Sequence, residues 1–195
     1  SLRYNIIDSG IALAGLGKGM DNIVAGMKTL TSEFGIAVSD AADMALPISR
    51  MAVDLAITDD QAAKVVGNFM LMGKRSKESA MHLVKQTKQL ALSVGLNPQD
   101  VFTEMAESSE TVSLHTKGTG ENMVEATIYA KQFGLSLDTL GKTADALLDI
   151  QNSYTNELEA SMLLGDRINL QKARELAYTG DLPGMMKEVL NQVGG

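Results

Sequence analysis

The stretch from Leu158 to Val193 decides the fold, and it reads LEASMLLGDRINLQKARELAYTGDLPGMMKEVLNQV. Gly165 ends its first apolar run, because glycine readily takes the left-handed conformation in which many helices stop. Asn169 is a good capping residue for a second helix, which Gly180 ends in the same way. Asp181 caps the last helix. The stretch therefore predicts two short helices that follow an earlier one.

Apolar residues recur three and four positions apart in both of these helices, which is the period of a helix with one buried face. They are Leu170, Ala173, Leu176 and Ala177 in the first helix, and Leu182, Met185, Met186, Val189, Leu190 and Val193 in the last. On periodicity alone the stretch is a helical hairpin of an all-α core.

The amino-acid sequence of this stretch resembles that of a known protein family. The runs Glu159–Gly165, Asn169–Ala177 and Gly180-Asp181 are similar to a stretch of the tail tape-measure proteins of contractile-tailed bacteriophages, and the similarity covers about residues 93–195. The resemblance implies a virion protein that lies inside the tail tube, sets tail length and leaves with or ahead of the DNA. It also implies three or six copies, contacts with tail-tube and hub or baseplate proteins, and a stay in the host cytoplasm during assembly.

The composition fits a folded protein with an aliphatic core. Of 195 residues, 45% are hydrophobic, yet there are only four Phe, four Tyr and no Trp, against twelve Met and eighteen Gly. A Met-rich core is adaptable, and the shortage of aromatic residues argues against a dedicated small-molecule pocket. No cofactor is expected. The chain begins with Ser-Leu-Arg and ends with Gly-Gly, so we expect a segment of a longer protein.

The charge is unevenly distributed. The net charge is −7, and residues 1–100 carry ten basic and ten acidic side chains, whereas residues 101–195 carry seven basic and fourteen acidic ones. Proteins that grip nucleic acid present a basic surface. We therefore expect no specific nucleic-acid binding.

Residues 2–34 carry a heptad pattern with apolar residues alternately three and four positions apart, which is typical of helices that associate. We predict a self-association seam formed by Ile6, Leu13, Leu16, Met20, Ile23, Met27, Leu30 and Phe34. Close-packing glycines accompany it, namely Gly10, Gly15, Gly17, Gly19 and Gly26. Each glycine within a helix costs about 1 kcal/mol relative to alanine, so we expect a bundle whose backbones approach closely.

A membrane span and a phosphate loop are two rival interpretations of this segment. The uncharged run that starts at Ser9 ends at Lys18, which is shorter than the roughly 18 residues of a membrane span. Residues 15–19 read GLGKG, but no Gly-Lys-Ser/Thr follows a four-residue spacer and no strand-like run precedes them. Neither interpretation is favoured.

The rest of the chain predicts helices with capped joints. A helix over 39–57 should bend or break at Pro47. Thr58 and Gln61 form a possible capping box. Gly95 is followed by Asn97 and Pro98, and the same stop-and-cap arrangement returns 39 residues later at 134–137. This spacing indicates a duplicated hairpin, separated by a polar loop over 109–120.

Few residues indicate a catalytic or metal-binding site. His82 and His115 are the only histidines, neither has a partner at metal-ligand spacing, and the chain has no Cys. Carboxylate pairs such as Glu104 with Glu107 lack any accompanying catalytic motif. We therefore expect neither a metal site nor an enzyme.

The sequence thus predicts an all-α protein, with a glycine-rich N-terminal coiled-coil or bundle helix followed by a compact multi-helix domain of short capped helices. Residues 1–57 should form the first part and residues 58–195 the second. The expected function is that of a tape-measure segment. Two alternatives remain open: a membrane-active helical module that makes transient contact with the host membrane and conducts DNA, and a helical adaptor unrelated to phages.

Overall fold

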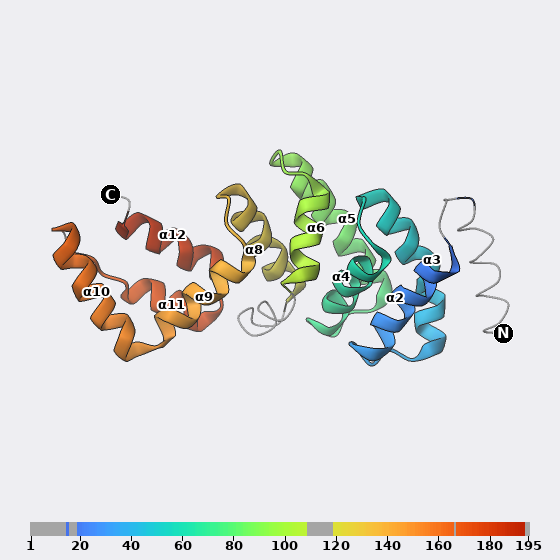
Figure 1. The fold of residues 1–195 in the computed structure, drawn as a ribbon, viewed down its shortest axis with the longest axis horizontal. Coiled ribbons are helices and arrows are strands. Elements are labelled where there is room, and N and C mark those ends of the chain that lie inside the picture. The colour runs from blue at the N-terminus through green and yellow to red at the C-terminus, as the bar shows by residue number, and fades with distance from the viewer. Residues whose placement is uncertain (1–14, 16–18, 109–118, 166, 194–195) are drawn as a thin grey trace. The chain divides into compact units, whose positions relative to one another are not determined.

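The structure is a computed structural model that describes residues 15, 19–108, 119–165 and 167–193. These residues form ten helices and no strand, so the all-α prediction is confirmed (Figure 1). The chain divides into two compact units, Ser1–Ser109 and Glu110–Gly195.

The first unit is built around one helix that is buried on nearly every side. Its helices are α2 (Met20–Ser32), α3 (Val38–Leu55), α4 (Asp59–Leu71), α5 (Lys77–Ser93) and α6 (Pro98–Glu107). Helix α4 contacts each of the other four. Its buried residues are Asp59, Ala62, Ala63, Val65, Val66, Gly67, Asn68 and Phe69. Because they surround the helix, α4 is the core around which unit 1 assembles.

Two polar contacts fix the start of α4 against its neighbours. The buried carboxylate of Asp59 accepts a hydrogen bond from the Ser49 hydroxyl of α3, and Asp60 accepts one from Thr29 of α2. A buried carboxylate without partners would be costly, so these bonds favour one docking of α2 and α3 on α4.

The predicted boundary between residues 57 and 58 does not divide the structure, which splits after Ser109. Ile57 is itself buried, and the backbone passes from α3 to α4 within three residues. Ile23 of α2 and Ile48 of α3 are fully buried in the same unit as α4. Helices α2 and α3 cannot therefore be separated from α4 without exposing a shared core.

The described part of the predicted seam faces this same core. Ile23 and Leu30 are almost completely buried, Met27 and Phe34 are half-buried, and Met20 is exposed. The side chains of Ile23 and Leu30 are therefore used within the chain and do not form an outer seam. Ile6, Leu13, Leu16, Gly10 and Gly17 lie outside the described residues, and self-association through them stays a prediction.

The predicted close-packing glycines that the structure describes, Gly15, Gly19 and Gly26, are not the sites of closest contact. Gly15 and Gly19 are exposed, and a Cβ at the buried Gly26 would meet its nearest neighbour, the Asp59 carbonyl oxygen, at 3.5 Å, an ordinary contact. A Cβ at Gly67 of α4 would instead lie 2.5 Å from the ring of Phe34. Gly67 is thus a glycine of unit 1 whose missing side chain admits a neighbouring ring.

The predicted caps and joints are confirmed. Thr58 and Gln61 exchange both bonds of a capping box, each 3.1 Å long, and Asn97 accepts a bond from the Gln99 amide. Gly95 and Gly134 both have left-handed backbone angles, φ +77° and +67°. In each joint the next residue donates a backbone bond across the helix end, to the carbonyls of residues 91 and 130. The two joints are therefore equivalent in geometry.

Helix α3 runs continuously through Pro47 and does not break there. Pro47 lacks an amide hydrogen, so the carbonyl of Asp43 loses its helical partner at that point. Packing of α3 on α2 and α4 compensates for the lost bond.

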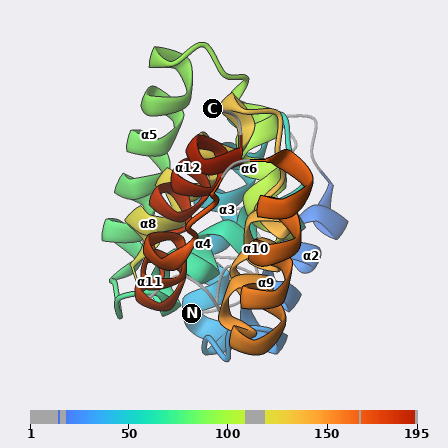
Figure 2. The ribbon, with the colours of Figure 1, turned by 90° about the vertical axis from the view of Figure 1, so that its left-hand side faces the viewer.

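The second unit contains α8 (Gly120–Gln132), α9 (Leu137–Leu148), α10 (Ile150–Leu164), α11 (Gln171–Thr179) and α12 (Leu182–Val193). Helices α11 and α12 form a hairpin that packs on α9, and α12 also contacts α8. Helix α10 follows α9 after a single residue and packs against it (Figure 2). Only one residue of α10, Ser153, is buried.

We predict that Gly67→Ala destabilises unit 1 by about 1–3 kcal/mol, because the added methyl group would displace the Phe34 ring. The matched change Gly26→Ala should be neutral or stabilising by up to about 1 kcal/mol, because alanine favours the helix and its methyl group has room. Urea unfolding followed by circular dichroism measures both. Equal stabilities for the two variants would contradict the packing described.

Candidate functional site: the apolar face of helix α10

Helix α10 presents an apolar row to solvent. Ile150, Tyr154, Leu158 and Met162 are four positions apart, and each is more than half exposed. We call these four residues the α10 stripe. Residues at this spacing lie along one side of a helix. Leu163, 87% exposed, and Leu164 extend the apolar surface at the end of the helix.

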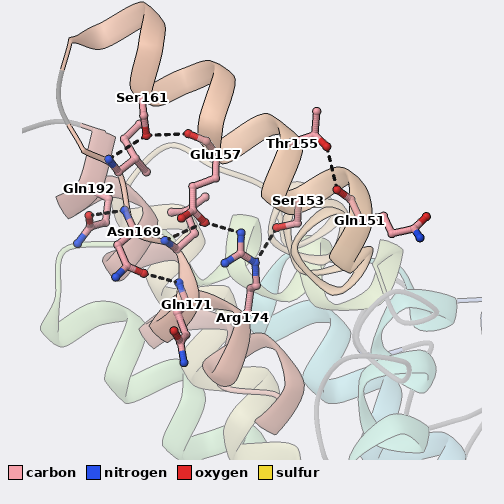
Figure 3. A network of polar contacts seen from close by, with 11 residues as sticks. Gln151, Ser153, Thr155, Glu157, Ser161, Asn169, Gln171, Arg174 and Gln192 are labelled. Atoms are coloured by element: carbon pink, nitrogen blue, oxygen red, sulfur yellow. Dashed lines mark hydrogen bonds and ion pairs between the residues drawn. The ribbon is translucent and has the colours of Figure 1, made fainter.

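The inward side of α10 is polar and is bound to Arg174 of α11. Arg174 donates from Nε to the Ser153 hydroxyl, 2.8 Å away, and from Nη2 to the Glu157 carboxylate (Figure 3). Its guanidinium carbon lies 3.9 Å from the centre of the Tyr154 ring. Arg174 is almost fully buried, so its ion pair with Glu157 is shielded from solvent. A cation–π contact with Tyr154 lies beside this ion pair.

Further hydrogen bonds join the same side of α10 to the segment before α11. The Glu157 carboxylate also accepts a bond from the Leu170 amide, 3.3 Å away. The Ser161 hydroxyl accepts one of 3.0 Å from the Ile168 amide and donates to the carbonyl of Glu157 (Figure 3). Helix α10 is therefore attached through its polar side chains along most of its length.

Helix α10 exposes apolar side chains beside polar ones such as Gln151, Thr155 and Glu159, whereas an amphipathic helix usually hides its apolar side. The stripe together with Leu163 and Leu164 forms a continuous run of exposed apolar side chains. The largest exposed apolar patch of a monomer is often functional. The α10 stripe is accordingly the candidate functional site.

The hairpin predicted from residues 169–193 is present, with some differences. Ala173, Ala177, Leu182, Met185 and Met186 are buried as predicted. The predicted burial is wrong for Leu190 and Val193, which are exposed near the end of α12. The predicted caps hold, since Asn169 accepts from the Gln171 amide and Asp181 accepts from the Gly184 amide.

Sequence reasoning missed Arg174 and the stripe. Arg174 follows the buried Ala173, at a position where the helical pattern predicts a solvent-exposed side chain. Its partner Glu157 is 17 residues away, so no local sequence pattern indicates that the two interact. The four-residue spacing of Ile150, Tyr154, Leu158 and Met162 indicates in the sequence that these residues share one side of a helix. That spacing alone predicts a buried face, the opposite of what the structure shows.

A second ion pair fixes α11 to α12. The Lys172 ammonium lies 3.0 Å from the Glu188 carboxylate. Its hydrogen bond lowers the pKa of Glu188 below the ordinary value, with help from Gln192 and against the effect of burial. A carboxyl whose pKa is lowered by folding stabilises the fold above its ordinary pKa, and this contribution disappears as the pH falls through the folded-state pKa.

The remaining candidate residues of the sequence analysis are not brought together within the described part of the chain. No group of three His, Cys, Asp or Glu residues among them could hold a metal ion. His82 lies exposed on α5, and His115 falls outside the described ranges. Glu104 and Glu107 bond to Ser108 and Gln61 at the end of α6. Within the part of the chain that the structure describes, no helix is long and apolar enough to cross a bilayer.

Comparison with known proteins gives no relative: no family model, curated protein or solved structure matches this chain.

We predict that Glu157→Met destabilises unit 2 by about 2–4 kcal/mol, because it leaves the buried Arg174 guanidinium without its counter-charge. The double variant Glu157→Met with Arg174→Met should lose less than Glu157→Met alone, since no buried charge is then unpaired. Hydrogen exchange of the α11 amides measures the stability of this unit.

Lys172→Met is the control, because Lys172 is well exposed and its ion pair with Glu188 should contribute little to stability. Additive losses in the double variant would show that Arg174 and Glu157 do not act as a pair.

Proposed function

We propose that this chain is a structural segment of a bacteriophage tail tape-measure protein and that it assembles through the α10 stripe. The observation that carries the structural role is the exposed apolar row Ile150, Tyr154, Leu158 and Met162, on a helix that is fixed by polar bonds along its adjoining face. A surface of this kind suits association with another protein and offers no group for catalysis.

The composition and charge of the site support association. The stripe together with Leu163 and Leu164 is apolar and exposed along one helix, as the core of a protein–protein interface requires. The four stripe residues carry no charge, so contact with another apolar surface leaves no unpaired ion.

The resemblance supports the biological setting. The runs Glu159–Gly165 and Asn169–Ala177, which resemble the tape-measure family, fall on the second half of α10 and on α11. They contain Met162 of the stripe and Arg174, which anchors α10. On this proposal the chain lies inside the tail tube in three or six copies, docks to the hub or baseplate, sets tail length and leaves during DNA ejection.

The two alternatives predict other behaviour. A membrane-active module would release dye from lipid vesicles at micromolar protein. An unrelated helical adaptor would belong to a parent chain that lacks the long heptad stretches of a length ruler.

We predict that residues 1–195 self-associate at about 10–100 µM and that Leu158→Asp with Met162→Asp reduces the chain to a monomer, since two buried carboxylates would oppose the contact. Both side chains are more than half exposed, so the fold should persist. Light scattering gives the mass. Leu71→Asp on α4 is the matched control, because Leu71 is 66% exposed and lies outside the stripe.

Self-association unaffected by the double change, or lost equally in the Leu71 control, would contradict a role for the stripe.

A length ruler also predicts an effect in the virus that encodes the chain. Deleting helical segments of the parent gene outside this region should shorten the tail in proportion to the residues removed, at about 1.5 Å per helical residue. Electron microscopy of virions measures this length. Tails of unchanged length would show that the chain is no tape measure.

A further inference from the structure

An apolar groove lies in unit 1 between α3 and α5. It consists of two adjoining hollows of about 320 and 340 Å³, which share Pro47, Met81 and Lys85. We call it the α3–α5 groove. Its apolar lining consists of Met44, Pro47, Ile48, Met51, Leu55, Met81 and Val84. The groove is open to solvent and has no occupant within the described residues.

We propose that the α3–α5 groove of one copy of this chain binds the α10 stripe of a second copy. This inference rests on the self-association proposed above and names the surface that receives the stripe. An apolar helix face that enters a groove between two helices is a common mode of recognition.

The two surfaces match in length. The residues of α3 that line the groove run from Asp43 to Leu55, twelve steps of a helix or about 18 Å. The stripe runs from Ile150 to Met162, which is also twelve steps and about 18 Å. The groove is therefore long enough to receive the whole stripe.

The chemistry of the groove suits bulky and irregular side chains. Met44, Met51 and Met81 contribute flexible thioethers, which adapt their shape to a partner and make favourable contacts with aromatic rings. The stripe supplies one aromatic ring, Tyr154, between aliphatic side chains.

The charges of the two surfaces have opposite signs. Within the groove the Lys88 ammonium bonds to the Asp54 carboxylate across α5 and α3, at 2.6 Å, and this pair neutralises itself. Its other charged residues are Arg50, Lys77, Lys85, Asp43 and Glu78, with a net charge of +1. Residues 149–164 hold two acidic residues outside the Arg174–Glu157 pair, Asp149 and Glu159, and no basic one. Opposite charges at the rim speed association and favour this pairing over contact between two acidic α10 helices.

The experiment uses two complementary variants of residues 1–195. The stripe variant carries Leu158→Asp and Met162→Asp and keeps its groove. The groove variant carries Met81→Asp and Lys85→Glu and keeps its stripe. Neither Met81 nor Lys85 is fully buried, so both substitutions should leave the fold intact. Circular dichroism of each variant is the check.

Each variant alone should be a monomer by light scattering, and an equal mixture should double in mass, because one intact stripe then meets one intact groove. A groove variant that self-associates like the unchanged chain while the stripe variant does not would overturn the groove proposal and leave the α10 stripe as the assembly surface. No loss of association in either variant would overturn both proposals.

Disulfide crosslinking is a second measurement that does not depend on disrupting the contact. The chain has no Cys, so a copy with Leu158→Cys and a copy with Met81→Cys can be joined only to each other or to themselves. Mixed under mild oxidation, they should form the mixed dimer several-fold faster than Leu71→Cys mixed with Met81→Cys. Equal rates would overturn the proposal.

Discussion

The buried ion pair between Arg174 and Glu157 determines which side of α10 faces outward. Arg174 comes from α11, and it holds the polar side of α10 at Ser153 and Glu157. A guanidinium with so little exposure needs its carboxylate, so α10 cannot rotate to bury its apolar row without leaving a charge unpaired. The outward stripe is a direct consequence of that constraint.

Unit 1 obtains its groove from a different constraint. Helices α3 and α5 both pack on α4, which is buried nearly all round. Each therefore turns its most apolar side to α4, and the remaining apolar residues between α3 and α5 line an open groove. The ion pair between Lys88 and Asp54 joins the two helices beside it. One unit thus exposes an apolar helix face and the other an apolar groove, although each has a well-filled core of its own.

Local features of the fold could be predicted from the sequence, and long-range ones could not. The helix ends at Gly95 and Gly134 and the capping box at Thr58 depend on residues within one helical turn. The local sequence is therefore sufficient to predict them. The buried position of Arg174 depends on a partner 17 residues away, and the close contact at Gly67 depends on Phe34, more than thirty residues earlier. The boundary after residue 57 was wrong for a related reason, since the burial of Ile23 and Leu30 beside α4 cannot be read from a heptad pattern.

The type of contact limits the kind of assembly that can form. If two α10 stripes paired with each other about a twofold axis, the contact would be satisfied in a dimer and would go no further. If a stripe enters the groove of a second copy, each copy still has one free stripe or one free groove, so copies continue to add until a ring closes or a filament grows. Three copies around one axis require a contact of the second type, because an interface between identical patches cannot close a three-membered ring. The three or six copies expected of a tape measure are therefore compatible with stripe-in-groove contacts, whereas pairing of stripes alone would stop at two.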